Sequence, residues 1–243
     1  MGISYSSSFF FLWALLPGNL FAKQPPDSII AQDISRYLRE ARSIISKRLN
    51  FITDPTSVKM KSHQFIDLAN RNYERSFGQP FDQKITANIF LTEAITDVFT
   101  EATTGAYKNR WLNDLYKKKF LPARFAREVA LKVSSKSKGL IVIRLTAPDK
   151  FLVNLANEAD DWERKAFQKI LDASWERNKA YSETFGIQNK KVFRYLLPEY
   201  YKRDCLECHG GEEGKRIHKE HIPGTLGGVG GAISIKITRS NKP

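Results

Sequence analysis

The chain has few of the side chains that build disulfide frameworks and metal clusters. Its 243 residues include two cysteines, two methionines and four histidines. No second cysteine pair accompanies Cys205 and Cys208, so a zinc site would need ligands from elsewhere. The pair His218 and His221 could supply two, which keeps zinc as a minor alternative.

Long hydrophobic runs are also missing after residue 22, which excludes a later membrane-spanning helix of about 18 apolar residues. The first 22 residues contain no charged side chain, and an apolar run from Phe9 to Leu16 precedes Pro17. This layout predicts a secretory signal peptide over residues 1–22 and a location in the periplasm or cell envelope. Because Lys and Arg are absent from its start, an uncleaved anchor is the alternative.

Acidic residues are in the minority, with 26 Asp and Glu against 39 Lys and Arg, a formal charge of +13. Such a surface favours an acidic partner, such as a redox or signalling protein, an anionic membrane surface or nucleic acid, over a neutral one. The basic residues are spread along the chain without a nucleic-acid motif, so we expect no nucleic-acid binding.

Both cysteines lie in one motif, Cys205-x-x-Cys208-His209. This is the attachment signature of c-type haem, in which each thiol adds to one vinyl group and the histidine binds the iron. It explains why the thiols come as a pair, and haem attachment outside the cytoplasm agrees with the leader. The motif predicts one covalent haem c on Cys205 and Cys208, with His209 as proximal iron ligand.

Two other interpretations of the pair are weaker. A disulfide between Cys205 and Cys208 would close a very short loop and constrain the unfolded chain little. A thioredoxin-like pair would sit between a strand and a helix of a βαβ unit, whereas a glycine-rich stretch follows this motif.

Helical periodicity dominates the first half of the chain, with Gly and Pro between the segments. It predicts helices over residues 27–52, 56–77, 82–104, 109–119 and 123–133, with Pro122 in the first turn of the last one.

The second half mixes strands with a helix. β-branched runs predict strands over residues 139–146, 192–197 and 232–238, the second ended by Pro198. Residues 148–159 are expected to form a loop, and the acidic residues that follow predict a helix from Asp160 to about Tyr181. This layout is α+β, with an antiparallel sheet.

Five blocks resemble the Tll0287-like family of c-type haem domains, which occur alone or as the sensors of histidine kinases. In order they are LPARFAREVALKV (121–133), GLIVIRLT (139–146), NLANEADDWE (154–163), FRYLLPEYYKRDCLECHGG (193–211) and GTLGGVGGAISI (224–235). The resemblance implies a PAS-like antiparallel sheet with flanking helices, after a long N-terminal helical region. We therefore expect a helical region over residues 23–80 and a PAS-like haem domain over residues 81–243.

The chain departs from the family pattern at two prolines, which are Leu155 and Ala159 here. Some members use an upstream cysteine as the second axial ligand, and this chain has no third cysteine. The distal side is therefore open between a protein ligand and a vacant site facing Phe90 and Phe99. The candidate ligands are His221, His218, His63 and Met60, with Tyr107 as a further one.

The main hypothesis is an exported monohaem cytochrome that transfers electrons, or senses redox state or a diatomic gas, with an acidic redox or signalling protein as partner. PAS-like sensors often pair through N-terminal helices, so a homodimer of that kind is expected. The alternative is a haem enzyme with peroxidase or nitrogen-oxide chemistry, which needs an acid–base group over an open distal site. His221 and Arg144 are candidates for that group, but no motif places them there.

Overall fold

The computed structural model describes residues 24–48, 60–104, 122–152, 154–187, 189–212 and 222–240. These residues form an α+β fold with six α-helices and a four-stranded antiparallel sheet. The helices are α1 (Asp27–Lys47), α3 (Ser62–Phe77), α4 (Thr86–Thr104), α5 (Pro122–Lys136), α6 (Asp161–Ile170) and α7 (Arg203–His209). Two short 3-10 turns, η1 (Asp149–Phe151) and η2 (Leu155–Asn157), precede α6.

The strands are β1 (Ile141–Thr146), β2 (Tyr181–Ile187), β3 (Lys190–Tyr200) and β4 (Val229–Ser240). Their order across the sheet is β1-β4-β3-β2, so the first strand pairs with the last. Ile235 on β4 lies opposite Ile143 on one side and Tyr195 on the other. This register places alternate residues of each strand on the same face of the sheet.

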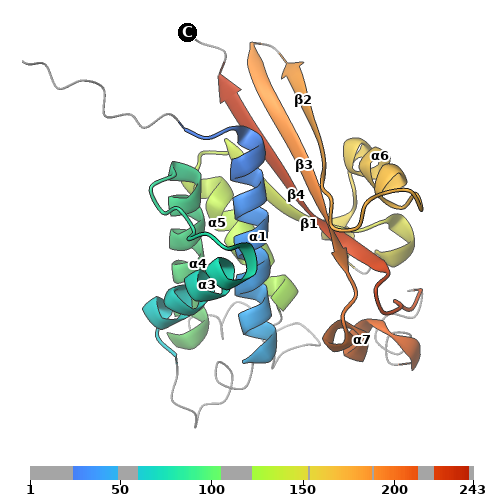
Figure 1. Cartoon of the computed structure of the whole chain (residues 1–243), viewed down its shortest axis with the longest axis horizontal. Helices are drawn as coiled ribbons and strands as arrows, with labels where there is room; N and C mark the ends of the chain where they lie inside the picture. Colours follow the sequence, from blue (N-terminus) through green and yellow to red (C-terminus); the bar gives the residue numbers. More distant parts are fainter. Residues whose placement is uncertain are drawn as a thin grey trace, which may run out of the picture.

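Helices cover both faces of the sheet (Figure 1). On one face lie α1, α3, α4 and α5, and on the other lies α6, while α7 follows the end of β3. Along β3, Phe193, Tyr195 and Leu197 pack in the large core with the four helices. Leu196, between them, packs with Phe167 of α6 in a second, smaller core.

The large core is shared by the N-terminal helices and the sheet. Leu38 of α1 and Phe65 of α3 are fully buried in the same cluster as Ile143, Ile235 and other sheet residues. The apolar side of α1 is therefore covered within the chain.

Most of the expected elements are confirmed. The helices at α1, α3, α4 and α5 and the strands at β1, β3 and β4 are present, and Pro122 is the first residue of α5. The helix expected over residues 109–119 and the signal peptide over residues 1–22 lie outside the described residues.

The helix expected from Asp160 to about Tyr181 is wrong at its end, because α6 stops at Ile170. Just beyond it, the Asp172 carboxylate accepts hydrogen bonds from the backbone N–H and the hydroxyl of Ser174, at 2.8 and 2.6 Å. Such a local turn competes with helix formation. Residues 181–187 then form β2, an edge strand that the sequence analysis did not identify.

The strand expected to end at Pro198 instead continues to Tyr200. Proline lacks the N–H that a central strand needs, but the pairing of β2 with β3 stops at Leu196. At Pro198, β3 has a neighbour on the β4 side alone, and the Pro198 carbonyl accepts a hydrogen bond from Arg39 Nη2 at 3.0 Å. The proline therefore costs the sheet no hydrogen bond.

Candidate functional site

The motif residues lie on one short helix. Cys205, Cys208 and His209 all belong to α7, and residues three and four apart in a helix share a face. The Cys205 thiol is half-buried and forms no disulfide. His209 is half-buried too, with Nδ1 shielded from solvent. The side chain of Cys208 lies outside the described residues.

Backbone hydrogen bonds hold the two ends of α7. Before the helix, the Tyr201 N–H donates to the Gly228 carbonyl at 2.8 Å, and the Gly227 N–H donates to the Tyr201 carbonyl at 2.9 Å. After the helix, the Gly224 N–H donates to the His209 carbonyl at 2.7 Å. The glycine-rich segment before β4 therefore closes both sides of the motif. Burial, and then the nearby Cys205 side chain, raise the pKa of Tyr201.

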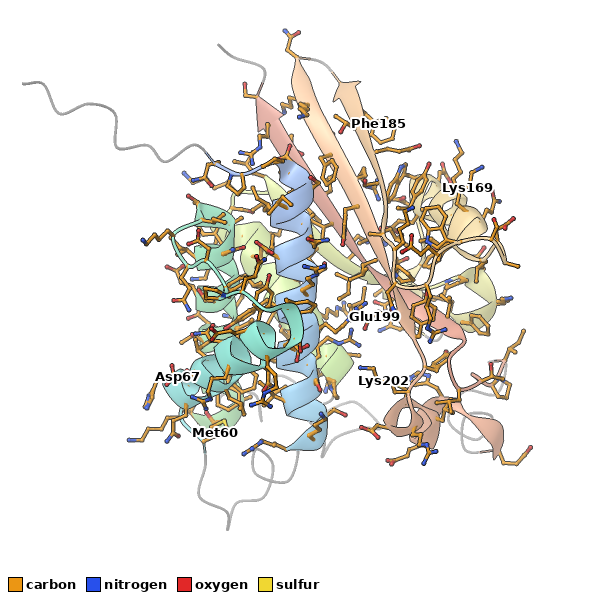
Figure 2. The ribbon with its side chains drawn as sticks, viewed as in Figure 1. Met60, Asp67, Lys169, Phe185, Glu199 and Lys202 are labelled. Carbon is orange, nitrogen blue, oxygen red and sulfur yellow. The ribbon has the colours of Figure 1, made fainter. Side chains whose placement is uncertain are left out.

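A charged cluster fixes the end of β3 that leads into α7. The Glu199 carboxylate accepts hydrogen bonds from Arg39 Nε and Arg42 Nη1, both at 2.7 Å, and both arginines come from α1. Burial by itself would raise the pKa of Glu199, but Arg42 and Arg39 outweigh it and hold that pKa below its usual range. The labelled Glu199 lies between α1 and the sheet in Figure 2.

The NLANEADDWE block attaches α6 to the sheet. Asp160 and Glu163 form a capping box at the start of α6, and the Glu163 side chain is fully buried. Glu163 pairs with Arg144 of β1 at 3.0 Å and with Arg194 of β3 at 3.4 Å. The Arg194 guanidinium also lies over the Trp162 ring, 4.4 Å from its centroid. This block therefore has a structural role in the described residues.

The structure describes two of the candidate distal ligands. Met60 is half-buried against the large core, and His63 is exposed at the start of α3. In Figure 2 the labelled Met60 and the labelled Lys202, which precedes α7, lie on either side of the lower part of α1. Outside the described residues lie Tyr107, His218 and His221. Phe99 is buried in the large core, and Phe90 is half-buried against it.

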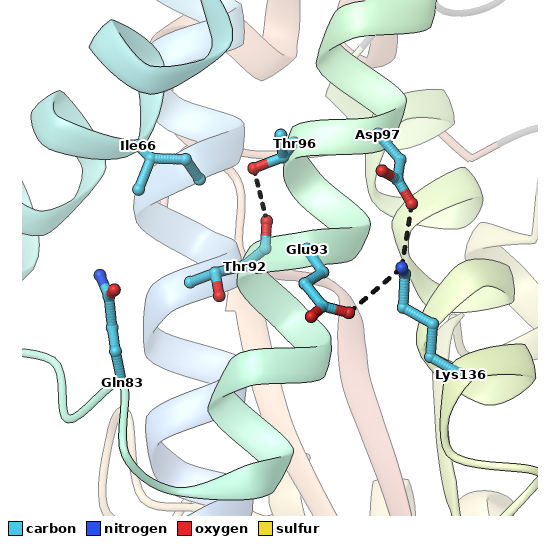
Figure 3. Close-up of a pocket in the computed structure, with 7 residues that line it drawn as sticks. All are labelled: Ile66, Gln83, Thr92, Glu93, Thr96, Asp97 and Lys136. Carbon is cyan, nitrogen blue, oxygen red and sulfur yellow. Dashed lines mark hydrogen bonds and ion pairs between the residues drawn. The ribbon is translucent and has the colours of Figure 1, made fainter.

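A polar pocket lies on the helical layer, between α3, α4 and α5 (Figure 3). Lys136 bridges Glu93 and Asp97 at 3.2 and 3.1 Å. Burial opposes the Lys136 charge, but Asp97 and Glu93 outweigh it and raise the pKa of Lys136. These charges satisfy one another, and the pocket contains none of the motif residues.

The described residues hold no cluster of three or more His, Cys, Asp or Glu that could bind a metal ion. Among the same residues, no helix is both long and apolar enough to cross a bilayer.

Sequence reasoning missed the residues that surround the motif from other parts of the chain. The sequence indicates that Tyr201 follows a strand and that Gly224 and Gly230 are turn residues. The dense spacing of glycines over residues 224–231 was the available signal, because it indicates close backbone approach.

Comparison with known proteins gives one match. No curated protein and no solved structure matches the chain. The model of the Tll0287-like family, described as Tll0287, matches residues 30–238, from within α1 to within β4. Because this match covers most of the chain, including both the helical layer and the motif, the protein belongs to the Tll0287-like family, which suggests a c-type haem domain.

Proposed function

We propose that the chain is an exported monohaem c-type cytochrome of the cell envelope, acting in electron transfer or in redox or gas sensing. Cys205 and Cys208 would hold the haem, and His209 would bind the iron. The observation that carries this proposal is the placement of all three residues on one short helix, α7, at positions that share a face.

The described residues fit this group. Cys205 is a free, half-buried thiol, and His209 has a half-buried imidazole whose backbone is held by Gly224. Attachment would add each S–H across one vinyl group, so that a C–S bond forms and the hydrogen goes to the other vinyl carbon. This addition consumes no oxidant or reductant. The two cysteines match the two vinyl groups of one haem.

When bound, the haem would supply an iron that changes by one electron or takes a diatomic gas. The protein's part is to hold that group in place. The two backbone connections of α7 and the Glu199 pairs fix the helix relative to β3, β4 and α1. A rigidly held α7 favours electron transfer with little rearrangement. The same contacts would pass a structural change at the motif to α1.

The haem-enzyme alternative would need an acid–base group over an open distal site. Arg144, one candidate for that group, is bound to Glu163 and to the Glu158 carbonyl, on the side of the sheet covered by α6. This engagement weighs against Arg144 in that role. We therefore keep the non-enzymatic function as the proposal.

The partner proposals follow from charge and location. An acidic redox or signalling protein suits a net charge of +13. Export through residues 1–22 would place the chain where such partners and the haem-attachment machinery meet. Pairing of two copies through the N-terminal helices stays a prediction.

Mass spectrometry of protein matured in a haem-competent host tests the proposal. The expected mass is that of the polypeptide plus one haem, and it should survive denaturation because the bonds are covalent. Cys205→Ser and Cys208→Ser should each leave one thioether, and the double variant should carry none. A wild-type chain at the bare polypeptide mass contradicts the proposal.

The absorption spectrum then separates the two modes of action. A low-spin reduced spectrum that CO leaves unchanged means two firm protein ligands and favours electron transfer. A spectrum that shifts with CO means an accessible iron and favours gas sensing. Replacing His218, His221, His63 and Met60 one at a time, with the masses as a control for haem attachment, identifies the distal ligand.

A further inference from the structure

Tyr201 lies where the sheet meets the motif helix. It follows β3 directly, is separated from α7 by Lys202, and is 8% exposed. Its N–H and carbonyl pair with Gly228 and Gly227, as an extra rung beyond the β3–β4 ladder. The position of its backbone is therefore set by both strands.

Two glycines make room for the Tyr201 ring. A Cβ added at Gly224 would lie 2.5 Å from Cε2 of the ring, and one added at Gly230 would lie 2.5 Å from Cζ. Non-bonded carbon atoms do not approach so closely, so any other residue at either position would move the ring. The Phe151 ring meets Tyr201 edge-on, with centroids 6.3 Å apart. The tyrosine ring is thus confined by two separate segments of the chain, η1 and the glycine-rich stretch over residues 224–231.

The confined ring lies beside the imidazole of His209. The two ring centroids are 5.8 Å apart and the planes are inclined at 37°. Gly224 joins the two groups, because it touches the Tyr201 ring while its N–H binds the His209 carbonyl at 2.7 Å. The side chain of His209 therefore lies against the Tyr201 ring, and its backbone is held by Gly224.

We propose that Tyr201 is a positioning residue for the proximal ligand, and that its ring fixes the orientation of the His209 imidazole. This inference rests on the proposed function, since it assigns a role toward the iron. Groups that surround a metal-binding histidine set the orientation of its ring and tune the metal. The tyrosine acts here through its aromatic ring, because the contact with His209 is between the two rings.

Electron paramagnetic resonance of the ferric protein and its midpoint potential test this role, because a merely structural residue would move neither. In Tyr201→Leu the imidazole loses its aromatic neighbour, so we expect broadened resonance lines and a shifted potential. Tyr201→Phe keeps the ring, so its resonance lines and midpoint potential should match those of the wild type. Tyr195→Leu is the matched control, since Tyr195 is also a buried tyrosine but lies within β3 and packs in the large core. It should lower stability and leave both readouts at wild type.

The outcomes separate failure of the inference from failure of the proposed function. A wild-type chain without covalent haem contradicts the function itself. A wild-type chain with haem, together with Tyr201→Leu protein whose resonance and potential match wild type, overturns the inference alone. If Tyr201→Leu does not fold, Gly230→Ala serves instead, because its added methyl group pushes the intact ring. Unchanged resonance and potential in that folded variant would equally overturn the inference.

Discussion

Glu199 shows how one carboxylate connects the motif region to the first helix. It lies two residues before Tyr201 and is held by Arg39 and Arg42, with ion-pair distances of 2.6 and 2.7 Å. All three side chains are largely shielded from solvent, so these pairs are worth more than surface pairs.

Replacing Glu199 with glutamine should lower the free energy of unfolding at pH 7 by about 1–3 kcal/mol, since two charge-assisted hydrogen bonds are lost. The pKa of Glu199 is lowered in the folded protein, so its stabilisation is complete above the pKa of an unfolded glutamate, about 4.3. The stabilisation is lost as pH falls through the lower, folded value. Urea unfolding at several pH values should show the difference between wild type and variant shrinking in acid.

Glu176→Gln is the matched control, because Glu176 is exposed and pairs with Lys179, also exposed, at 3.5 Å. We expect it to change stability by less than about 0.5 kcal/mol at any pH. A difference between Glu199→Gln and wild type that grows in acid would contradict the assignment.

At this scale the sequence was informative wherever chemistry depends on spacing along the chain. The spacing of Cys205, Cys208 and His209 was enough to predict haem attachment, whereas their placement on one helix, α7, was not predicted. The proximity of Tyr201 to His209, and of Arg39 to Glu199, was not predictable. These contacts depend on how separate elements pack.

Charged contacts attach α6 to the sheet. It is ten residues long, too short to be stable alone, and its buried surface is a small apolar cluster. The Glu163 carboxylate satisfies the Asp160 N–H at 2.9 Å as well as two arginines. One side chain therefore both caps the helix and fixes it to β1 and β3.

Glu163→Ala should lower the free energy of unfolding by about 2–4 kcal/mol, because it leaves Arg144 and Arg194 without their buried partner. Guanidinium unfolding followed by far-ultraviolet circular dichroism measures this loss. Asp161→Ala, in the same turn but with a side chain 97% exposed, should cost less than about 1 kcal/mol. Equal losses in the two variants would mean that the arginine pairs do not hold the helix.

The glycine-rich segment before β4 has no room for a side chain beside the Tyr201 ring. Gly224→Ala would place a methyl carbon against the Tyr201 ring, so we expect a loss of about 1–3 kcal/mol in stability. Gly186→Ala on β2 is the control, since an added Cβ there meets no atom within 4 Å. It should be neutral or slightly stabilising, because alanine loses less backbone entropy than glycine. Thermal unfolding of both variants measures the contrast, and a fully stable Gly224→Ala would mean that the ring can move aside.

Element boundaries show why local patterns were sometimes insufficient. Apolar residues after Ile170 continue a loose helical pattern, yet the Asp172 turn ends α6 and β2 pairs with β3. Pro198 is a strand breaker by local rules, but it is tolerated because β2 pairs with β3 only up to Leu196. Both errors arise because sheet pairing decides what the backbone does at those positions.

Across the whole molecule, one core joins the N-terminal helices to the sheet, and the family match also begins within α1. The helices do not lie beside the haem motif in sequence, yet Arg39 and Arg42 of α1 reach the end of β3. A change at α7 can therefore be transmitted to α1 through Glu199.

The net charge of +13 is also a property of the whole molecule, and removal of residues 1–22 leaves it unchanged because they carry no charged side chain. The association rate with an acidic redox partner should therefore fall about tenfold or more as ionic strength rises from low to high. Stopped-flow electron transfer over a salt series measures this, with a neutral osmolyte as the control for viscosity. A rate independent of salt would count against an acidic partner.

The sequence alone determined the features whose physical cause acts over a few residues. These are the spacing of the Cys205-x-x-Cys208-His209 motif, the acidic first turn of α6, the proline at the start of α5 and the alternation over residues 235–238 of β4. The tertiary structure decided which distant groups meet, including Tyr201 with His209 and Glu199 with α1. The reason is that spacing and periodicity act through the local backbone, whereas these contacts exist only after strand register and helix packing bring separate segments together.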